Sequence, residues 1–264
     1  MSTPSGVPQA PVSAGGVEGQ AAVIGEVQQK EMYSLRFDGS SYLNRNFGAS
    51  ATNNKFTISM WVKRSALASA VNAGHFMLMN AWSGNNNTAI KFAANSQLPL
   101  NAFSVDWSNH GVSTSHWRGT QAVFRDTISW YHLIWNFDNN PFKNELWVNG
   151  SLDTTYGNLS GYSNPNSTQI NDSLPHNIGR YPHTNSYYFN GYLANIHFID
   201  GEALEPSSFG ELISDVWRPA SYSGDYGVNG FHLDFDPDNM VYDSNGKLTQ
   251  VKDASGNDNH WTAN

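Results

Sequence analysis

The chain has 264 residues, only 14% of them charged and 13% aromatic, and it carries a formal net charge of -8 at pH 7. Nucleic acids and anionic membranes attract proteins through clusters of Lys and Arg, and the sequence contains no such cluster, so both are disfavoured as partners. The absence of cysteine excludes disulfide bonds and zinc sites built on thiolates.

Residues 1–31 are expected to form an N-terminal arm. Prolines and glycines interrupt every hydrophobic period in this segment, so it cannot bury enough apolar surface to fold alone. It has neither the basic region nor the long apolar run of a secretory signal, and we expect no membrane insertion. The apolar residues Val23 and Ile24 are the candidate anchor by which the arm would order on a partner; a tail without a partner is the alternative.

Alternating apolar and polar residues predict a series of short β-strands after the arm. The expected strands cover residues 33–37, 56–63, 75–79, 88–92, 103–107, 130–137, 145–150, 177–180 and 188–199. In the 56–63 strand, one face is entirely apolar and is the candidate core face: Phe56, Ile58, Met60 and Val62. The opposite face, which includes Trp61, is the alternative. In the 188–199 strand, the alternation predicts one shared face: Leu193, Asn195, His197 and Ile199.

Only residues 206–212 favour a helix, as a single turn that begins at Pro206. Many short strands separated by turn residues indicate an all-β sandwich or barrel. One more strand is expected at 230–235, but residues 216–264 are too few for a second core. We therefore expect the arm at 1–31, the main β domain at 32–215, and a C-terminal extension at 216–264 that packs on that domain or on a neighbouring subunit.

Three stretches of the main domain match a known pattern in chain order. They are Phe56–Val62, Trp130–Gly150 with its Trp-x-His start and Val-Asn-Gly turn, and Phe189–Leu204. They resemble the early core strand, the hairpin and the closing strand of laminin-G-like domains of the concanavalin-A-like lectin/glucanase group. The resemblance covers roughly residues 33–215. It implies an antiparallel β-sandwich of the concanavalin-A-like jelly-roll type.

The residues after position 203 add a more specific resemblance. Leu204–Gly210, Trp217–Pro219 and Gly227–Leu233 are similar to a subgroup of these domains found in phage virion structural proteins, where the domain sits on fibres or head appendages. Asp253–Asn257 resembles the opening of a further laminin-G-like repeat. Alternatively, this last segment packs back on the sandwich or pairs with the edge strand of a neighbour.

The sequence lacks the acidic pattern of the enzymes in this group. Glucanases use the pattern Glu-x-Asp-x-x-Glu to supply an acid and a nucleophile, and it does not occur here. The nearest acidic cluster, Asp234, Asp236 and Asp238, has no Glu partner and is expected to form a solvated turn. Relatives that bind calcium carry acidic residues where this chain has Ala194 and Asn195. We expect no enzyme activity, no catalytic residue, no metal site and no cofactor; calcium is an unsupported alternative.

Aromatic residues in or beside polar loops are the candidate binding residues. The candidates are Trp82, Trp107, Trp117, Tyr162, Tyr181 and Tyr187, and Tyr156 and Tyr188 share their setting. Exposed rings stack on the faces of sugars while neighbouring Asn and Asp side chains bind hydroxyl groups. The same rings also form protein interfaces or pack in cores. Glycan binding, an interface and core packing are therefore three alternatives for these residues.

The resemblance and the composition together predict a phage virion structural protein, either a capsid decoration or head-fibre component or a tail-fibre component. It would be made in the host cytoplasm and would display a lectin-like domain on the virion surface. The arm would bind other capsid or tail proteins, and a homo-oligomer such as a trimer is expected because virion appendages often have closed symmetry. The alternative is an adhesion module that binds host polysaccharide, and a polysaccharide-degrading enzyme is the third hypothesis.

Overall fold

The protein divides into residues 1–31 and a compact unit of residues 32–264. The computed structural model describes residues 32–49, 55–70, 75–84, 86–93, 98–109, 114–155 and 168–264, with the backbone alone for residues 108–109 and 114–117. All structural statements concern these residues. The predicted arm, with Val23 and Ile24, lies outside them. Among the described residues there is no helix with the length and apolar character of a membrane span.

The first sheet has seven antiparallel strands. Its order is β1 (Ser34–Asp38), β12 (Asn190–Asp200), β3 (Lys55–Arg64), β8 (Tyr131–Asn139), β9 (Phe142–Val148) and β10 (Ser151–Leu152), and β15 (Phe231–Leu233) pairs with the second half of β12. The most aromatic sequence segment forms the centre of this sheet, because β8 pairs with both β3 and β9.

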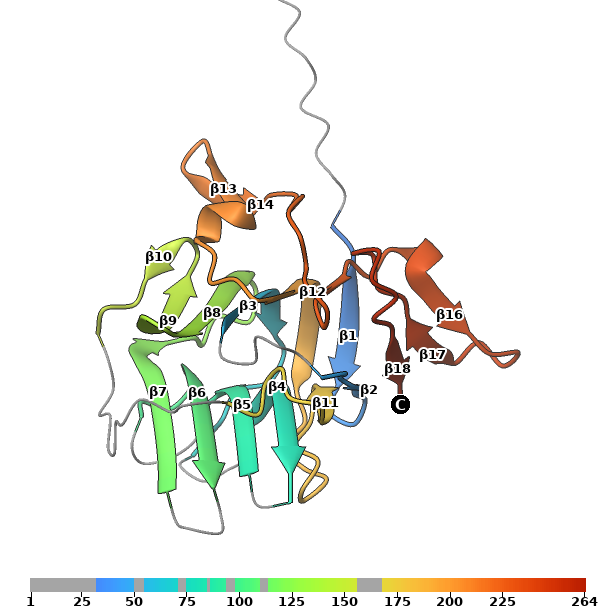
Figure 1. Ribbon diagram of the computed structural model, residues 1–264, viewed down its shortest axis with the longest axis horizontal. Coiled ribbons are helices and arrows are strands. Elements are labelled where there is room, and N and C mark those ends of the chain that lie inside the picture. The colour runs from blue at the N-terminus through green and yellow to red at the C-terminus, as the bar shows by residue number, and fades with distance from the viewer. Residues whose placement is uncertain are drawn as a thin grey trace, which may run out of the picture. The chain divides into compact units, whose positions relative to one another are not determined.

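The second sheet has nine antiparallel strands (Figure 1). Its order is β16 (Met240–Tyr242), β17 (Leu248–Val251), β18 (Trp261–Ala263), β2 (Leu43–Asn46), β11 (Pro175–Ile178), β4 (Phe76–Ser83), β5 (Asn86–Phe92), β6 (Ala102–Asn109) and β7 (Thr114–Val123). The two sheets form a sandwich, and the predicted all-β jelly-roll fold is confirmed.

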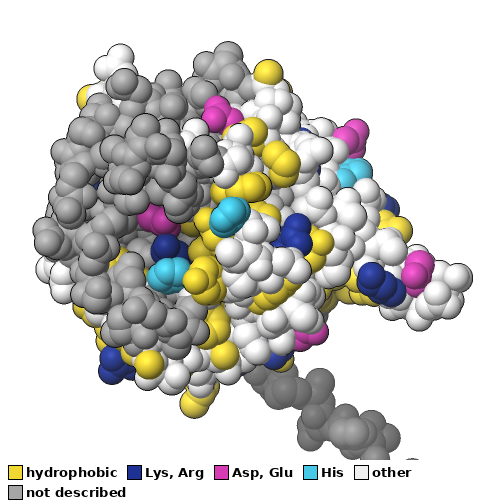
Figure 2. All heavy atoms as spheres, turned by 90° about the horizontal axis from the view of Figure 1, so that it is seen from below, with side chains coloured by type: hydrophobic (Ala, Val, Ile, Leu, Met, Phe, Trp, Pro, Cys, Tyr) yellow, Lys and Arg dark blue, Asp and Glu magenta, His cyan; other side chains and the backbone are white. Residues whose placement is uncertain are grey.

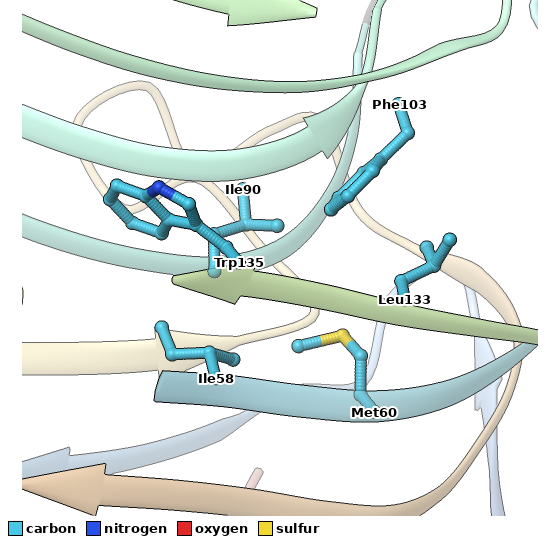
Figure 3. A pocket seen from close by; sticks show the side chains of 6 residues that line it. All are labelled: Ile58, Met60, Ile90, Phe103, Leu133 and Trp135. Atoms are coloured by element: carbon cyan, nitrogen blue, oxygen red, sulfur yellow. The ribbon is translucent and has the colours of Figure 1, made fainter. Parts of the chain in front are cut away.

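The main core lies between the two sheets. The predicted apolar face of β3 is fully buried in it: Phe56, Ile58, Met60 and Val62. Figure 3 shows how residues of both sheets meet there, with side chains from β3 and β8 facing Ile90 of β5 and Phe103 of β6. The space between these side chains is too small for a water molecule. The gap is thus part of a close-packed core and not a ligand site.

The prediction for the face of β12 was wrong, because a bulge shifts the alternation within the strand. The register to β3 is interrupted between Ala194 and His197, and Asn195 adopts a left-handed φ of 42°. Leu193 therefore faces the main core together with Ile196 and Phe198, whereas His197 and Ile199 face the other side of the sheet. An extra residue in one strand reverses the direction of every side chain after it.

A third layer covers the outer face of the first sheet. The predicted helical turn is confined to the 3-10 helix η1 (Pro206–Ser208), and the chain then forms the hairpin of β13 (Gly210–Ile213) and β14 (Val216–Pro219). A Cβ at Gly210 would meet the indole of Trp217 at 2.4 Å, so only glycine fits where the indole packs on this strand. Trp217 Nε1 donates to Nδ1 of His132, 2.9 Å away and fully buried in β8. Two of the three tail motifs of the sequence, Leu204–Gly210 and Trp217–Pro219, thus build this layer.

Residues 216–264 contribute strands to both sheets. β15 pairs with β12, and β18 pairs with β2. The segment that resembles the opening of another repeat packs back on the same sandwich: Asp253 accepts hydrogen bonds from the backbone N–H groups of His232, Ser255 and Asn259. Trp261 follows this turn and is fully buried against Phe231.

Candidate functional site

A row of aromatic rings lies along β4 on the outer face of the second sheet. His75 and Tyr187 have ring centroids 5.3 Å apart, Tyr187 and Tyr181 5.9 Å, Tyr181 and His183 6.1 Å, and His183 and Trp82 5.0 Å. We call these five residues the ring row. The chain of contacts links the beginning of β4 to its end through loop 180–188.

The ring row lies outside the main core. Tyr181 packs on Met77 of β4 and Ala89 of β5, and these three residues form a hydrophobic cluster separate from the one between the sheets. Their neighbours along the strands, Leu78 and Ile90, point into the main core. Because side chains alternate between the two faces of a strand, Tyr181 covers the outer face of the second sheet.

Local backbone geometry presents the Tyr187 ring. Tyr181 and Ser186 form two backbone hydrogen bonds of 2.9 and 3.2 Å that close the loop. Tyr187 has a left-handed φ of 53°, and its carbonyl oxygen accepts from Met77 N at 3.1 Å. A left-handed conformation costs a bulky residue about 1–2 kcal/mol, so the surrounding contacts must hold it. The Tyr187 side chain remains 40% exposed.

Four ionisable groups at or beside the ring row, Lys91, Asp106, His75 and Tyr181, are paired or neutral. Lys91 Nζ and Asp106 Oδ1 lie 2.8 Å apart, and both side chains are largely buried. Burial, with a smaller effect from Lys91, lowers the pKa of His75 to about 4. Burial, aided by Asp106, raises the pKa of Tyr181 to about 12. At neutral pH His75 and Tyr181 are therefore uncharged hydrogen-bonding groups.

Amide side chains form a second polar element on the same face. Asn44, Asn177 and Asn80 face one another in register across β2, β11 and β4. Three buried atoms make no hydrogen bond with a described residue: Oδ1 of Asn80, Nε1 of Trp82 and Oδ1 of Asn86. A buried polar group without a partner costs about 1–3 kcal/mol, which a bound hydroxyl group or water molecule would recover.

The predicted candidates fall into three groups. Trp82, Tyr181 and Tyr187 come together in the ring row, and Tyr188 donates to Asn185 in the same loop. Trp107 is instead buried in the main core, because it alternates with Asp106 on β6 and points inward. Trp117 lies opposite Asp106 in the β6–β7 register, without a described side chain. Tyr156 and Tyr162 lie outside the described residues.

Sequence reasoning missed His75 and Asn80, which are placed at the ring row only by strand register, and Arg180 in the adjoining loop. His183, in the same loop, was not among the candidates either. Its position between two aromatic candidates, Tyr181 and Tyr187, is the signal that could have identified it.

The acidic cluster 234–238 forms a turn, as expected. Asp234 accepts from Asp236 N and from Nδ2 of Asn239, and Asp236 caps the 3-10 helix η2 (Pro237–Asn239) by accepting from Asp238 N. No group of three or more His, Asp or Glu side chains close enough to hold a metal ion occurs in the described part of the chain.

The ring row combines apolar faces with hydrogen-bond donors and acceptors. Tyr, Trp and His rings present a flat apolar body and a polar tip, and the adjacent amides supply both donors and acceptors. Such a surface matches a ligand with apolar C–H faces and many hydroxyl groups.

Comparison with known proteins agrees with the fold. A family model for the concanavalin A-like lectin/glucanases superfamily, of laminin-G type, matches residues 37–208. A structure of a candidate carbohydrate-binding protein from Bacteroides ovatus is similar with a TM-score of 0.62 and 13% identity; the match covers 88% of this chain and 58% of that chain. This chain therefore spans less than two thirds of that protein.

Two further structures match over smaller parts. A heptameric SAP-like pentraxin from Limulus polyphemus has a TM-score of 0.44 and 14% identity, over 65% of this chain and 76% of that chain. The receptor-binding domain of botulinum neurotoxin type G has a TM-score of 0.40 and 12% identity, over 66% of this chain and 44% of that chain. Comparison with curated protein sequences finds no match. With a family model that covers most of the sandwich, the chain belongs to the concanavalin A-like lectin/glucanases superfamily as a domain of laminin-G type.

Proposed function

We propose that this chain is a lectin-like carbohydrate-binding module whose glycan lies along the ring row. The observation that carries the proposal is the continuous series of rings from His75 to Trp82, with buried unpaired polar atoms at the Trp82 end. The Bacteroides ovatus structure, described as a candidate carbohydrate-binding protein, agrees with this assignment.

The test compares binding of wild type, Trp82→Ala and Tyr187→Ala to a panel of soluble polysaccharides by affinity electrophoresis and calorimetry. Each variant removes one ring that a sugar would cover, and a loss of about 1.4 kcal/mol corresponds to a tenfold weaker affinity. Tyr242→Ala is the matched control, because Tyr242 is also an exposed aromatic residue of the second sheet, on the edge strand β16 and away from β4. Equal affinity of all four proteins, or no binding to any polysaccharide, would overturn the proposal.

The proposal assigns binding without catalysis. Release of reducing ends during incubation of the wild type with a bound polysaccharide would instead favour the third hypothesis, a polysaccharide-degrading enzyme. Unchanged polymer length after long incubation is the expected result.

A second proposal concerns where the module is displayed. We infer that the chain is a phage virion surface protein, a capsid decoration, head-fibre or tail-fibre component, attached through residues 1–31 to other virion proteins. The supporting observation is that the motifs resembling phage structural proteins form ordered parts of the fold. Trp217 bonds the third layer to His132, and Phe231 begins β15. The proposal includes a homo-oligomer such as a trimer.

Immunogold labelling of purified particles, with antibodies to residues 32–264, tests the location. Labelled heads or tails are expected, and protein found only in lysate would contradict the virion assignment. A variant without residues 1–31 tests the arm, because particles that it still decorates normally would exclude the arm as the anchor. Sedimentation of the full chain measures the oligomeric state.

A further inference from the structure

The guanidinium of Arg180 is held in one orientation beside the ring row. Its Cζ lies 3.5 Å from the ring centroid of Tyr42, which fixes the plane of the group. Its Nε donates to Oδ1 of Asn177 at 3.1 Å and its Nη1 to Oδ1 of Asn185 at 3.0 Å, which fix the rotation within that plane. Asn185 is itself held by Tyr188, whose hydroxyl donates to the same oxygen at 2.8 Å.

One terminal nitrogen of the Arg180 guanidinium has no hydrogen-bond partner among the described residues. Nη2 makes no hydrogen bond with a described residue, and neither acceptor of Arg180 is charged. Other ordered arginines differ: Nη1 and Nη2 of Arg36 bond to Gly191 O and Asn190 Oδ1, and both terminal nitrogens of Arg64 are also bonded. Arg180 therefore presents an oriented donor edge without a protein acceptor for its charge.

This edge adjoins the ring row. Asn185, which bonds Arg180, belongs to the loop that carries His183 and Tyr187, and its bond to Arg180 is exposed to solvent. Asn177 lies opposite Asn80 on the neighbouring strand, and paired strands are about 5 Å apart. A glycan that follows the rings along β4 would thus pass within reach of Arg180.

We infer that Arg180 forms an oxyanion subsite of the glycan site and recognises an acidic sugar, through the carboxylate of a uronic acid or a sulfate ester. The inference rests on the proposed carbohydrate-binding function. Arginine suits this role because its guanidinium stays charged, and the bonds at Nε and Nη1 orient the two N–H donors of the remaining Nη2 toward an oxyanion. Lys91, the other described cation near the rings, is already neutralised by Asp106.

The net charge of -8 does not oppose this assignment. Charges separated by more than a Debye length, about 8 Å at physiological salt, are largely screened from each other. Only the groups around Arg180 act strongly on a ligand at that position, and no ion pair joins Arg180 to a described acidic residue.

The experiment measures binding of the full chain to three polymers by affinity electrophoresis and calorimetry: polygalacturonate, dextran sulfate and neutral dextran. Arg180→Gln should weaken binding to at least one acidic polymer tenfold or more and leave binding to the neutral polymer within twofold. Arg180→Lys should restore only part of the affinity, because a lysine keeps the charge and loses the fork. The acidic polymer affected distinguishes a carboxylate from a sulfate.

Arg36→Gln is the matched control, since Arg36 also lies over a tyrosine ring, that of Tyr192, and bonds an asparagine. Its substitution makes the same change in net charge on the other sheet and should leave binding unchanged. If Arg36→Gln and Arg180→Gln weaken binding to the acidic polymer equally, the subsite is refuted, because the polymer then responds only to net charge. If Trp82→Ala abolishes binding while Arg180→Gln has no effect, the carbohydrate function stands and the oxyanion subsite is refuted; if no polymer binds, both fail. Thermal unfolding of each variant verifies that it is folded.

Discussion

Replacing Trp261 with alanine tests whether the C-terminal residues belong to the cooperative core. Trp261 is fully buried, and its ring centroid lies 5.0 Å from that of Phe231 and 6.1 Å from that of Phe47. It therefore packs β18 against β15 of the first sheet and against Phe47, the residue that follows β2 of the second sheet. Removal of a fully buried tryptophan costs about 3–5 kcal/mol, as lost burial and as a cavity that neighbours fill only partly. A typical domain has 5–15 kcal/mol of stability in total, so the expected loss is a large fraction.

Urea unfolding, followed by far-ultraviolet circular dichroism and by fluorescence, measures this loss as a lower transition midpoint at an unchanged slope. Tyr242→Ala is the control, because Tyr242 lies in the same C-terminal region with a side chain that is 55% exposed. Its effect should stay within about 0.5 kcal/mol. A loss below about 1 kcal/mol for Trp261→Ala would refute the reasoning, because β18 would then add little to the folded unit.

Three further predictions concern buried polar groups and the β12 bulge. Arg64→Lys should lower the free energy of unfolding by about 1–3 kcal/mol in urea titrations, because a lysine cannot bond both Phe124 O and Asn101 Oδ1, and an unchanged midpoint would contradict this. Burial lowers the pKa of His132 to about 3, so unfolding takes up a proton below the ordinary pKa near 6.5, and stability present above pH 6.5 is lost as the pH falls toward 3. His132→Gln should therefore lose less stability between pH 7 and pH 5 than wild type in midpoints measured at about those two values, whereas equal losses would show that this histidine does not titrate on unfolding. Asn195→Val should be less stable than Asn195→Gly by about 1–2 kcal/mol in thermal unfolding, because both lose the amide and only valine is strained at the left-handed φ of 42°; equal stability would argue against the bulge.

The ring row shows how far sequence reasoning extends toward a site. Trp82, Tyr181 and Tyr187 were identifiable as aromatic residues beside polar loops, but so was Trp107, which packs in the core. Sequence separation cannot distinguish the two outcomes, because the direction of a strand residue depends on its register with a partner strand. His75 and Tyr187 are 112 positions apart in the chain, and only the pairing of loop 180–188 with β4 brings their rings within 5.3 Å.

Period-two alternation by itself determined that the chain is all-β, where most strands lie, and which face of β3 is buried, because a pleated strand half-covered by a core must alternate. Composition determined that the surface is rich in uncharged polar groups, and Figure 2 shows a face on which few side chains are charged and hydrophobic ones form a band. Two features are visible only in the tertiary structure: the face to which each side chain of β12 points after Asn195, and the burial of Trp261 in the core. The orientation of the Arg180 guanidinium, with Nη2 free to donate, is also visible only in the tertiary structure. Each depends on contacts between residues distant in sequence, and a local pattern carries no information about the partner that such a contact requires.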